Sequence, residues 1–326
     1  MKIGINSFFF DNKVHDGPKI FIKRLKDSII KNKLAIATNT YHPFYDIGIF
    51  SVLDKNYYFK DYVLRVDGIY IDLFNYVGDS KKLNNKIFDK ISNAKGIVFI
   101  SEFSKKIVEK FYRKKILNST IIHNKVPTSL FKNYGDTARS KLNIPKDKIV
   151  LITAAKWRRH KRLEETIKFL KILNEKKNIY KLIVLGENTN HEKNDDVYFV
   201  GKVNLDDLPY WYRAADIYVH LCWIEACGNT QIEALACGLP VLCCNNGGIG
   251  ETIIRSRGGI VSLADKEYNF EKVDLYNPPE PDYKILKSDL EKIFKNYQFY
   301  VKNIDYKYLD IDMAAEEYIS FINKIR

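Results

Sequence analysis

The sequence predicts an α/β protein built from two Rossmann-like domains. Short apolar runs alternate with helical ones, the same alternation restarts near the middle of the chain, and 326 residues suffice for two domains. The composition, 46% hydrophobic and 29% charged, is that of an ordinary globular protein. We expect residues 1–145 to form one domain, residues 146–300 a second, and residues 301–326 a helical segment that crosses back to the first.

The first half of the chain contains five β-like runs separated by helical stretches. A helix is predicted over Pro18–Ile30, because apolar residues recur there at three- and four-residue spacing and Gly17 allows a tight turn before it. A second helix is predicted from Glu102, with apolar residues on one face and most cations on the other. The predicted strands are Lys2–Phe9, Leu34–Thr38, Tyr62–Val66, Gly96–Ile100 and Ser119–His123.

The second half repeats this alternation after a polar stretch at residues 134–148. Helices are expected at Leu163–Leu173, Leu205–Arg213, Asn229–Cys237 and, at the end of the chain, Met313–Ile325. The predicted strands are Ile149–Ala154, Lys181–Leu185, Val197–Val200, Asp216–Leu221 and Pro240–Cys244.

The net charge of +13 is concentrated in one half of the chain. Residues 1–150 carry +14 and residues 151–326 carry −1. This excess has two interpretations, a basic face that serves solubility alone or a surface for an anionic partner, which would be an acidic acceptor or an anionic membrane surface. No apolar run approaches the roughly 18 residues that span a bilayer, and residues 1–6 do not read as a signal peptide, so we expect a cytoplasmic protein, peripherally membrane-associated at most.

The cysteines and histidines predict neither disulfides nor a metal site. Five cysteines is an odd number and two are adjacent, which argues against a disulfide framework and favours buried free thiols. The six histidines show no metal-ligand spacing. The cysteines are Cys222, Cys227, Cys237, Cys243 and Cys244.

The segment from Leu221 to Val241 carries the most functional information. A strand ends at Leu221, a loop bearing Glu225 turns at Gly228, and a helix follows with Glu233 in its first turns. The amides at the start of that helix suit a phosphate, and the two carboxylates can accept hydrogen bonds from sugar hydroxyls. For carboxylates chosen at random, a solvated surface role would be the better interpretation.

The order of these residues resembles the signature of retaining GT-B glycosyltransferases, specifically glycosyltransferase family 4. Glu225 and Glu233 match its two glutamates separated by seven residues, and Glu233 to Val241 matches the run that follows them. Residues 247–251, Gly-Gly-Ile-Gly-Glu, resemble the family's Gly-Gly-x-x-Glu loop. The resemblance covers about residues 150–262 and implies two Rossmann-like domains facing each other across a cleft.

The resemblance implies a role for each matching residue. Glu233 would bind ribose hydroxyls, and Glu225 would bind and orient the donor sugar. Backbone amides would hold the phosphates and the sugar, and the backbone near residues 200–202 would meet the base. The residues implied for donor binding are Gly17, Gly201, Lys202, Gly228, Asn229, Thr230, Glu233, Gly247 and Gly248.

A cluster of cations follows the strand Ile149–Ala154, where α/β proteins place anionic ligands. Lys156 and Lys161 have the separation of the Arg and Lys with which the family neutralises the departing diphosphate. Lys replaces the usual Arg, so Arg158, Arg159 and Arg162 compete with Lys156 for the first position. A solvated basic turn or a nucleic-acid patch is the alternative interpretation.

The first half matches the family less closely. The His that many relatives place in the cleft is missing, and the corresponding run contains Arg65 and Asp67. Asp67 could bind a sugar hydroxyl or the acceptor nucleophile, and a structural ion pair with Arg65 is an equal alternative. Lys125 stands where Gly is expected after Asn124, and Asp310 and Asp312 match a metal-binding Asp-x-Asp by coincidence, because they lie in the helical tail.

We therefore expect a metal-independent glycosyltransferase that transfers a sugar from a nucleotide-diphosphate sugar to a glycan or lipid-linked hydroxyl with retention of configuration. The expected catalytic residues are Glu225, Lys161, Lys156, Arg158 and Asp67. No cofactor is expected beyond the nucleotide sugar as co-substrate, and no nucleic-acid partner. The alternatives are a non-transferring GT-B enzyme, such as a sugar-nucleotide epimerase, and a polyanion- or membrane-binding protein.

Overall fold

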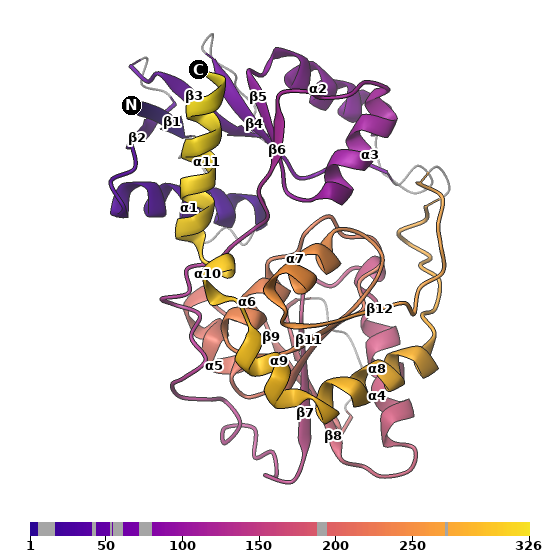
Figure 1. Ribbon diagram of the computed structural model, residues 1–326. Helices are drawn as coiled ribbons and strands as arrows, with labels where there is room; N and C mark the ends of the chain where they lie inside the picture. The colour runs from indigo at the N-terminus through magenta and orange to yellow at the C-terminus, as the bar shows by residue number, and fades with distance from the viewer. Residues whose placement is uncertain are drawn as a thin grey trace.

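The protein folds into two parallel sheets of six strands, one above the other in Figure 1, with helices packed around each. The computed structural model describes residues 1–5, 17–40, 44–52, 54, 61–71, 80–187, 194–270 and 273–326. This architecture confirms the predicted pair of Rossmann-like domains.

The first sheet has the order β2-β1-β3-β4-β5-β6, and every pair in it is parallel. Parallel strands covered on both faces are buried, which explains why β4 reads as an unbroken buried run. The strand at Ile47–Ser51 was not predicted, because Gly48 interrupts its apolar run. Of the predicted strand Lys2–Phe9, residues 6–9 lie outside the described chain. The strands are β1 (Lys2–Ile5), β2 (Ile36–Asn39), β3 (Ile47–Ser51), β4 (Tyr62–Val66), β5 (Gly96–Phe99) and β6 (Ser119–Ile121).

Helices α1 (Gly17–Lys31), α2 (Ser80–Asn93) and α3 (Glu102–Tyr112) flank this sheet, and the last helix of the chain also packs on it. Ser101 begins α3 through a capping box with Ser104. The helix buries Ile107 and Val108 while Lys106 and Lys110 are exposed, as its amphipathic pattern predicts.

The second sheet has the order β12-β11-β10-β7-β8-β9 and is also parallel throughout. Its strands are β7 (Ile149–Ala154), β8 (Tyr180–Leu185), β9 (Val197–Gly201), β10 (Ile217–His220), β11 (Val241–Cys244) and β12 (Gly259–Ser262). Its helices are α4 (Leu163–Asn174), α5 (Leu208–Tyr212), α6 (Thr230–Ala236), α7 (Ile249–Ser256) and α8 (Tyr283–Lys295). The predicted helix Leu205–Arg213 is a 3-10 turn over Leu205–Asp207 followed by α5.

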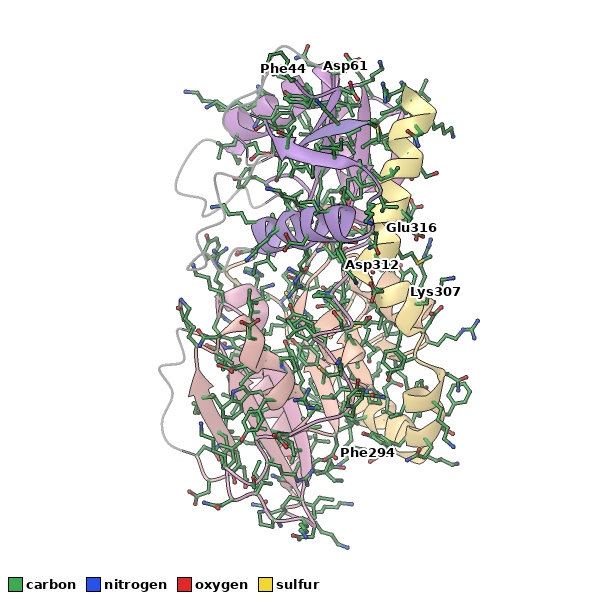
Figure 2. The ribbon with its side chains drawn as sticks, turned by 90° about the vertical axis from the view of Figure 1, so that its left-hand side faces the viewer. Phe44, Asp61, Phe294, Lys307, Asp312 and Glu316 are labelled. Carbon is green, nitrogen blue, oxygen red and sulfur yellow. The ribbon has the colours of Figure 1, made fainter. Side chains whose placement is uncertain are left out.

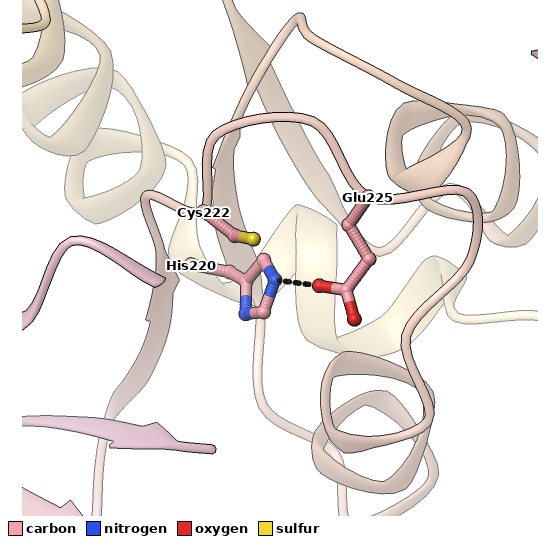
Figure 3. Close-up of side chains that lie close together, drawn as sticks. All are labelled: His220, Cys222 and Glu225. Carbon is pink, nitrogen blue, oxygen red and sulfur yellow. Dashed lines mark hydrogen bonds and ion pairs between the residues drawn. The ribbon is translucent and has the colours of Figure 1, made fainter. Parts of the chain in front are cut away.

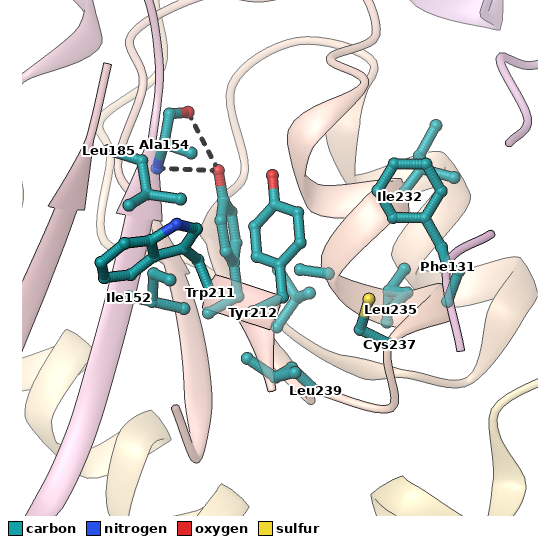
Figure 4. Close-up of a cluster of buried hydrophobic side chains, with 14 of the residues drawn as sticks. Phe131, Ile152, Ala154, Leu185, Trp211, Tyr212, Ile232, Leu235, Cys237 and Leu239 are labelled. Carbon is teal, nitrogen blue, oxygen red and sulfur yellow. Dashed lines mark hydrogen bonds between the residues drawn. The ribbon is translucent and has the colours of Figure 1, made fainter. Parts of the chain in front are cut away.

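The second domain has a core on each face of its sheet, and one of them lies between the sheet and the pair α5 and α6. Figure 4 shows Trp211 and Tyr212 of α5 packed among the sheet residues and Ile232 and Leu235 of α6. All five cysteines are buried and free, as predicted. This packing fixes the position of α6, which carries Glu233.

The carboxyl-terminal chain runs through α9 (Tyr297–Asn303) and α10 (Tyr306–Leu309) into α11 (Ile311–Ile325), which returns to the first domain. Figure 2 shows α11, with Asp312 and Glu316 labelled, beside α1. Helix α11 buries Ala314, Ala315 and Tyr318 in the first domain's core. No helix in the described part of the chain is long and apolar enough to cross a bilayer.

The Asp-x-Asp sequence has a structural role at this crossing. Asp310 caps α11 by accepting a hydrogen bond from the Asp312 amide at 2.8 Å, and Asp312 accepts one from Ser28 Oγ at 2.7 Å. Asp310 also forms a parallel bridge with Val126, so the two segments that connect the domains lie side by side.

Candidate functional site

Glu225 lies at the centre of a polar cluster at the carboxyl end of β10. Lys161 Nζ is 2.7 Å from its Oε1, and His220 Nε2 is 2.8 Å from its Oε2 (Figure 3). Burial would raise the pKa of the Glu225 carboxyl, but Lys161 and His220 outweigh it and hold that pKa well below its usual range. Glu225 is therefore an anion that two neighbours orient.

Lys161 is positioned by the 3-10 turn Arg159–Lys161, which leads into α4. Burial alone would lower the pKa of its ammonium, but Cys222 and Glu225 outweigh burial and raise it. Lys161 therefore stays protonated beside the carboxylate, which makes it a fixed positive charge near the carboxyl end of β10.

Glu233 lies one turn into α6, and both of its carboxylate oxygens are engaged. Tyr212 Oη donates to Oε2 at 3.2 Å, and Arg24 Nη2 from α1 is 2.9 Å from Oε1. The Glu233 side chain is 3% exposed and that of Arg24 is 9% exposed. This buried ion pair joins the two domains.

A chain of amide hydrogen bonds crosses the same interface. Asn124 Nδ2 donates to Asn229 Oδ1 at 3.0 Å, and Asn229 Nδ2 donates to the Gly17 carbonyl at 3.3 Å. Arg65, fully buried, donates to Asn124 Oδ1 at 2.8 Å and pairs with Asp67 at 2.5 Å. The structure thus contains the Arg65–Asp67 ion pair that the sequence left as an alternative, and Asp67's role in chemistry stays a prediction.

The loop between β11 and α7 packs directly behind Glu225. Glu225 and Gly247 form a parallel bridge, and the Gly248 amide donates to the Glu225 carbonyl at 2.9 Å. A Cβ on Gly248 would collide with the Ala226 carbonyl oxygen and lie 2.5 Å from Ser101 Oγ. Glycine is required there because two domains meet at its α-carbon.

Glu251, at the first turn of α7, reaches the amino terminus of α3 in the other domain. Its carboxylate accepts hydrogen bonds from the Glu102 amide at 2.8 Å and the Phe103 amide at 2.9 Å, and lies 2.9 Å from His123 Nε2. Burial raises the pKa of the Glu251 carboxyl, but these three hydrogen bonds outweigh it and lower the pKa.

The structure separates the four cations that compete for the first diphosphate position. Arg159 is engaged by Glu165 at 2.5 Å, and Arg162 is buried against Asp265 at 2.9 Å. Lys156 and Arg158 are exposed, and neither has an ion pair within the described chain. These two remain available to an anionic ligand.

The amides at the start of α6 are also available. Within the described residues, no main-chain carbonyl accepts a hydrogen bond from the amides of Gly228 or Asn229. Thr230 Oγ1 accepts from Tyr218 Oη at 2.8 Å, which fixes the first residue of the helix. Gly201 has φ +81° with open space at its Cβ position, and Lys202 pairs with Glu187 at 3.1 Å.

Residues 135–267 match the family model "Glycosyl transferases group 1". The matched region holds Glu225, Glu233, the cations after β7 and the loop after β11, whereas Arg24 and Gly17 lie outside it. The group 1 match thus covers the second domain, and the first domain supplies partners to it across the interface.

Curated relatives match this chain over short segments. A D-inositol 3-phosphate glycosyltransferase of Pseudarthrobacter chlorophenolicus is 32% identical over 139 residues, which is 40% of this chain and 31% of that protein. A phosphatidylinositol monomannoside mannosyltransferase of Mycobacterium tuberculosis, named as GDP-mannose-dependent, is 35% identical over 74 residues, or 21% of this chain and 19% of that protein. The chain therefore spans less than a third of the length of these relatives.

Solved structures match the fold over the whole chain. Sucrose-phosphate synthase from Thermosynechococcus elongatus has a TM-score of 0.74 at 14% identity, covering 100% of this chain and 99% of that one. HepE from Anabaena, in complex with UDP-glucose, has a TM-score of 0.68 at 13% identity, covering 99% and 100%. At these identities the likeness establishes the fold, which is the two-domain GT-B arrangement.

Two parts of the site were missed from the sequence. Arg24 lies three residues after Phe21 and four before Ser28, both buried, so an arginine on the apolar face of α1 was the available signal. His220 and Cys222 lie beside Glu225 although their spacing fits no metal motif, because a turn at Ile224 (φ +53°) brings the chain back.

Proposed function

We propose that this protein is a glycosyltransferase that transfers a sugar from a nucleotide-diphosphate sugar to an acceptor hydroxyl, with retention of configuration, as in family 4. The observation that carries the proposal is the pairing of Lys161 with Glu225 at 2.7 Å, beside the uncommitted amides of Gly228 and Asn229. A fixed cation and free amide donors at one end of a sheet suit a diphosphate, and a buried carboxylate suits sugar hydroxyls.

In this proposal each second-domain group contacts one part of the donor. Glu233 binds the ribose, and Glu225 binds and orients the sugar. Lys161, with Lys156 or Arg158, offsets the charge that develops on the leaving diphosphate. The amides of Gly228, Asn229 and Thr230, and those near Gly247 and Gly248, hold the phosphates and sugar, and the backbone near Gly201 and Lys202 meets the base.

A ribose can bind to Glu233 only if the carboxylate gives up one of its present hydrogen-bond partners. Arg24 and Tyr212 now occupy its two oxygens, so a ribose hydroxyl replaces one of these hydrogen bonds. Because Arg24 belongs to α1, the exchange couples nucleotide binding to the contact between the domains.

The proposed chemistry uses the acceptor hydroxyl as the nucleophile. It attacks the anomeric carbon on the face from which the diphosphate leaves, and the leaving phosphate oxygen takes its proton. Protein cations perform the charge stabilisation that a divalent metal performs in other transferases, so we expect activity to persist in a chelator. Closure of the domains excludes water and limits hydrolysis of the donor.

The first domain, residues 1–145 in this proposal, is the acceptor side. Its charge of +14 over residues 1–150 favours an anionic or lipid-linked acceptor at a membrane surface. The matched relatives are named for inositol phosphate and phosphatidylinositol mannoside, which are anionic. In this proposal the donor side is residues 146–300, and the segment formed by residues 301–326 joins it to the first domain.

A thermal-shift screen of nucleoside diphosphates and their sugars tests the donor site, because a ligand that binds the native state raises the unfolding temperature. We expect one nucleotide family to raise it. Incubation of that donor with and without an acceptor then separates transfer from epimerisation, since an epimerase alters the donor alone. Tight polyanion binding without any nucleotide response would contradict the proposal.

A further inference from the structure

Three potential metal ligands of different chemistry meet at the end of β10. A ring nitrogen of His220, Sγ of Cys222 and a carboxylate oxygen of Glu225 all lie within 4.8 Å of one another. His220 is the last residue of β10, and Cys222 follows two positions later in the loop that leads to Glu225. Figure 3 shows the Glu225 carboxylate and the Cys222 sulfur on the same side of the loop as the imidazole.

The backbone holds this arrangement in a conformation that is rare for its sequence. Ile224 has φ +53°, which a β-branched residue seldom adopts. The Ile224 amide donates to Asn246 Oδ1 at 2.6 Å, and the Trp223 amide donates to the His160 carbonyl at 2.7 Å. The loop that returns Glu225 to His220 is therefore fixed on both sides.

Imidazole, thiolate and carboxylate together are a ligand set for zinc. Zn²⁺ accepts nitrogen, sulfur and oxygen ligands, and sites with three protein ligands keep a fourth position open to water. His220 Nε2 and Glu225 Oε2 are now 2.8 Å apart in a hydrogen bond. Two bonds of 2.0–2.1 Å at a tetrahedral metal need about 3.3 Å between ligand atoms. These two atoms therefore have to separate by about half an ångström to bind one metal ion.

We propose that His220, Cys222 and Glu225 bind one Zn²⁺ ion. On binding, the Cys222 thiol loses its proton to solvent and forms the zinc–sulfur bond. The proton that His220 Nε2 now donates to Glu225 leaves that nitrogen, so a neutral imidazole with its proton on Nδ1 binds through Nε2 and ionised Glu225 binds through Oε2. Lys161 keeps its contact with the other oxygen, Oε1. The new thiolate charge lies beside the Lys161 ammonium, which offsets the repulsion between that ammonium and the metal.

The consequence for activity rests on the proposed function. Zinc would hold the Glu225 oxygen that the donor sugar needs, so micromolar zinc would inhibit transfer and a chelator would restore it. The binding itself requires no transferase activity, so a chain that binds zinc but transfers no sugar would leave the metal site standing and overturn only the proposed function.

The test is a zinc titration of the full chain by competition with a chromophoric chelator, followed by Co²⁺ substitution to detect thiolate coordination by absorption. We expect one ion per chain, a cobalt–thiolate band, and no displacement by excess Mg²⁺, which prefers oxygen ligands. Cys222→Ser and His220→Asn should each weaken zinc binding on the order of 100-fold. This is the upper end of the loss in metal affinity seen when a residue that only hydrogen-bonds a ligand is removed, and these two residues are ligands themselves.

Cys237→Ser is the matched control, because Cys237 is 3% exposed and Cys222 is 2% exposed. It should retain the wild-type affinity and the cobalt band. Unfolding temperatures in chelator establish that each variant is folded, and His220→Asn provides a second test if Cys222→Ser does not fold. Unchanged affinity in both site variants, or equal loss in Cys237→Ser, would overturn the proposal.

Discussion

Arg24 Nη2 lies 2.9 Å from Glu233 Oε1, although the two residues are 209 positions apart and belong to different domains. The Arg24 guanidinium also lies over the Phe131 ring, 5.2 Å from its centroid. The carboxylate that we assign to ribose binding is thus held by a residue of the other domain. The Glu233 side chain therefore serves both the proposed nucleotide site and the interface between the domains.

Removing either partner of this pair should destabilise the protein strongly. Arg24→Ala leaves the Glu233 carboxylate buried and short of a partner, at a cost of about 3–5 kcal/mol in free energy of unfolding. The double variant Arg24→Ala/Glu233→Ala should lose much less than the sum of the single losses, because it leaves no unpaired charge. Urea denaturation of the four proteins measures this coupling.

The control is a more exposed ion pair whose cation also lies on α1 and whose carboxylate lies on α11. Lys31 Nζ lies 3.1 Å from Asp312 Oδ2, with side chains 66% and 33% exposed. Lys31→Ala should cost at most about 1 kcal/mol. Additive losses at Arg24 and Glu233, or a Lys31 loss as large as that at Arg24, would contradict the account of the interface.

Most of the fold was predictable from the sequence because parallel strands and amphipathic helices leave local patterns. Strands β4 and β7 were predicted with the bounds that the structure has, since buried runs of Val, Ile and Leu are bounded by polar residues. Strand β3 was missed although it is as long as β4, because Gly48 interrupts its apolar run.

The candidate site was predictable only where one local segment carries it. Glu225 and Glu233 lie on a single loop and helix, so their spacing and the run of residues around them were enough to single them out as candidates. Arg24 meets Glu233 only through the packing of two domains, which no local pattern encodes. The engagement of Arg162 by Asp265 likewise depends on residues 103 positions apart, so the sequence could not remove Arg162 from the candidate cations.

The cations after β7 should divide into ligand-binding and structural groups. The double variant Lys156→Ala/Arg158→Ala should keep the free energy of unfolding within about 0.5 kcal/mol, because both side chains are exposed. It should weaken nucleoside diphosphate binding about 10- to 100-fold, as expected for one charge-assisted hydrogen bond. Calorimetric titration and urea denaturation measure the two effects.

Arg162→Ala should show the reverse of the Lys156→Ala/Arg158→Ala variant, with a loss of stability as its main effect. It leaves Asp265 buried and unpaired, so it should lower the free energy of unfolding by about 3–5 kcal/mol. A stable Arg162→Ala protein with weakened nucleotide binding would instead place Arg162 on the diphosphate.

Substitutions at Glu233 and Lys161 should affect different kinetic steps. Glu233→Gln keeps the side-chain volume but removes the charge that accepts ribose hydroxyls, so KM for the donor should rise about tenfold. Lys161→Ala removes charge stabilisation at the leaving diphosphate, so kcat should fall about 10²- to 10³-fold. Steady-state kinetics with the donor from the thermal-shift screen measure both, and full activity in both variants would refute the site assignment.

Glu251 should make the interface between the domains sensitive to acid. Its folded-state pKa lies below the usual 4.5, so its contribution to stability is complete above pH 4.5 and is lost as the pH falls through the folded-state pKa. Glu251→Gln should lower the unfolding midpoint by a constant amount between about pH 5 and 7, and this difference should shrink below pH 4.5. Glu102→Gln, which removes an exposed carboxylate from the amino terminus of α3, should change stability by at most about 0.5 kcal/mol. A Glu251→Gln difference that persists undiminished into acid would show that its carboxylate charge does not hold the two domains together.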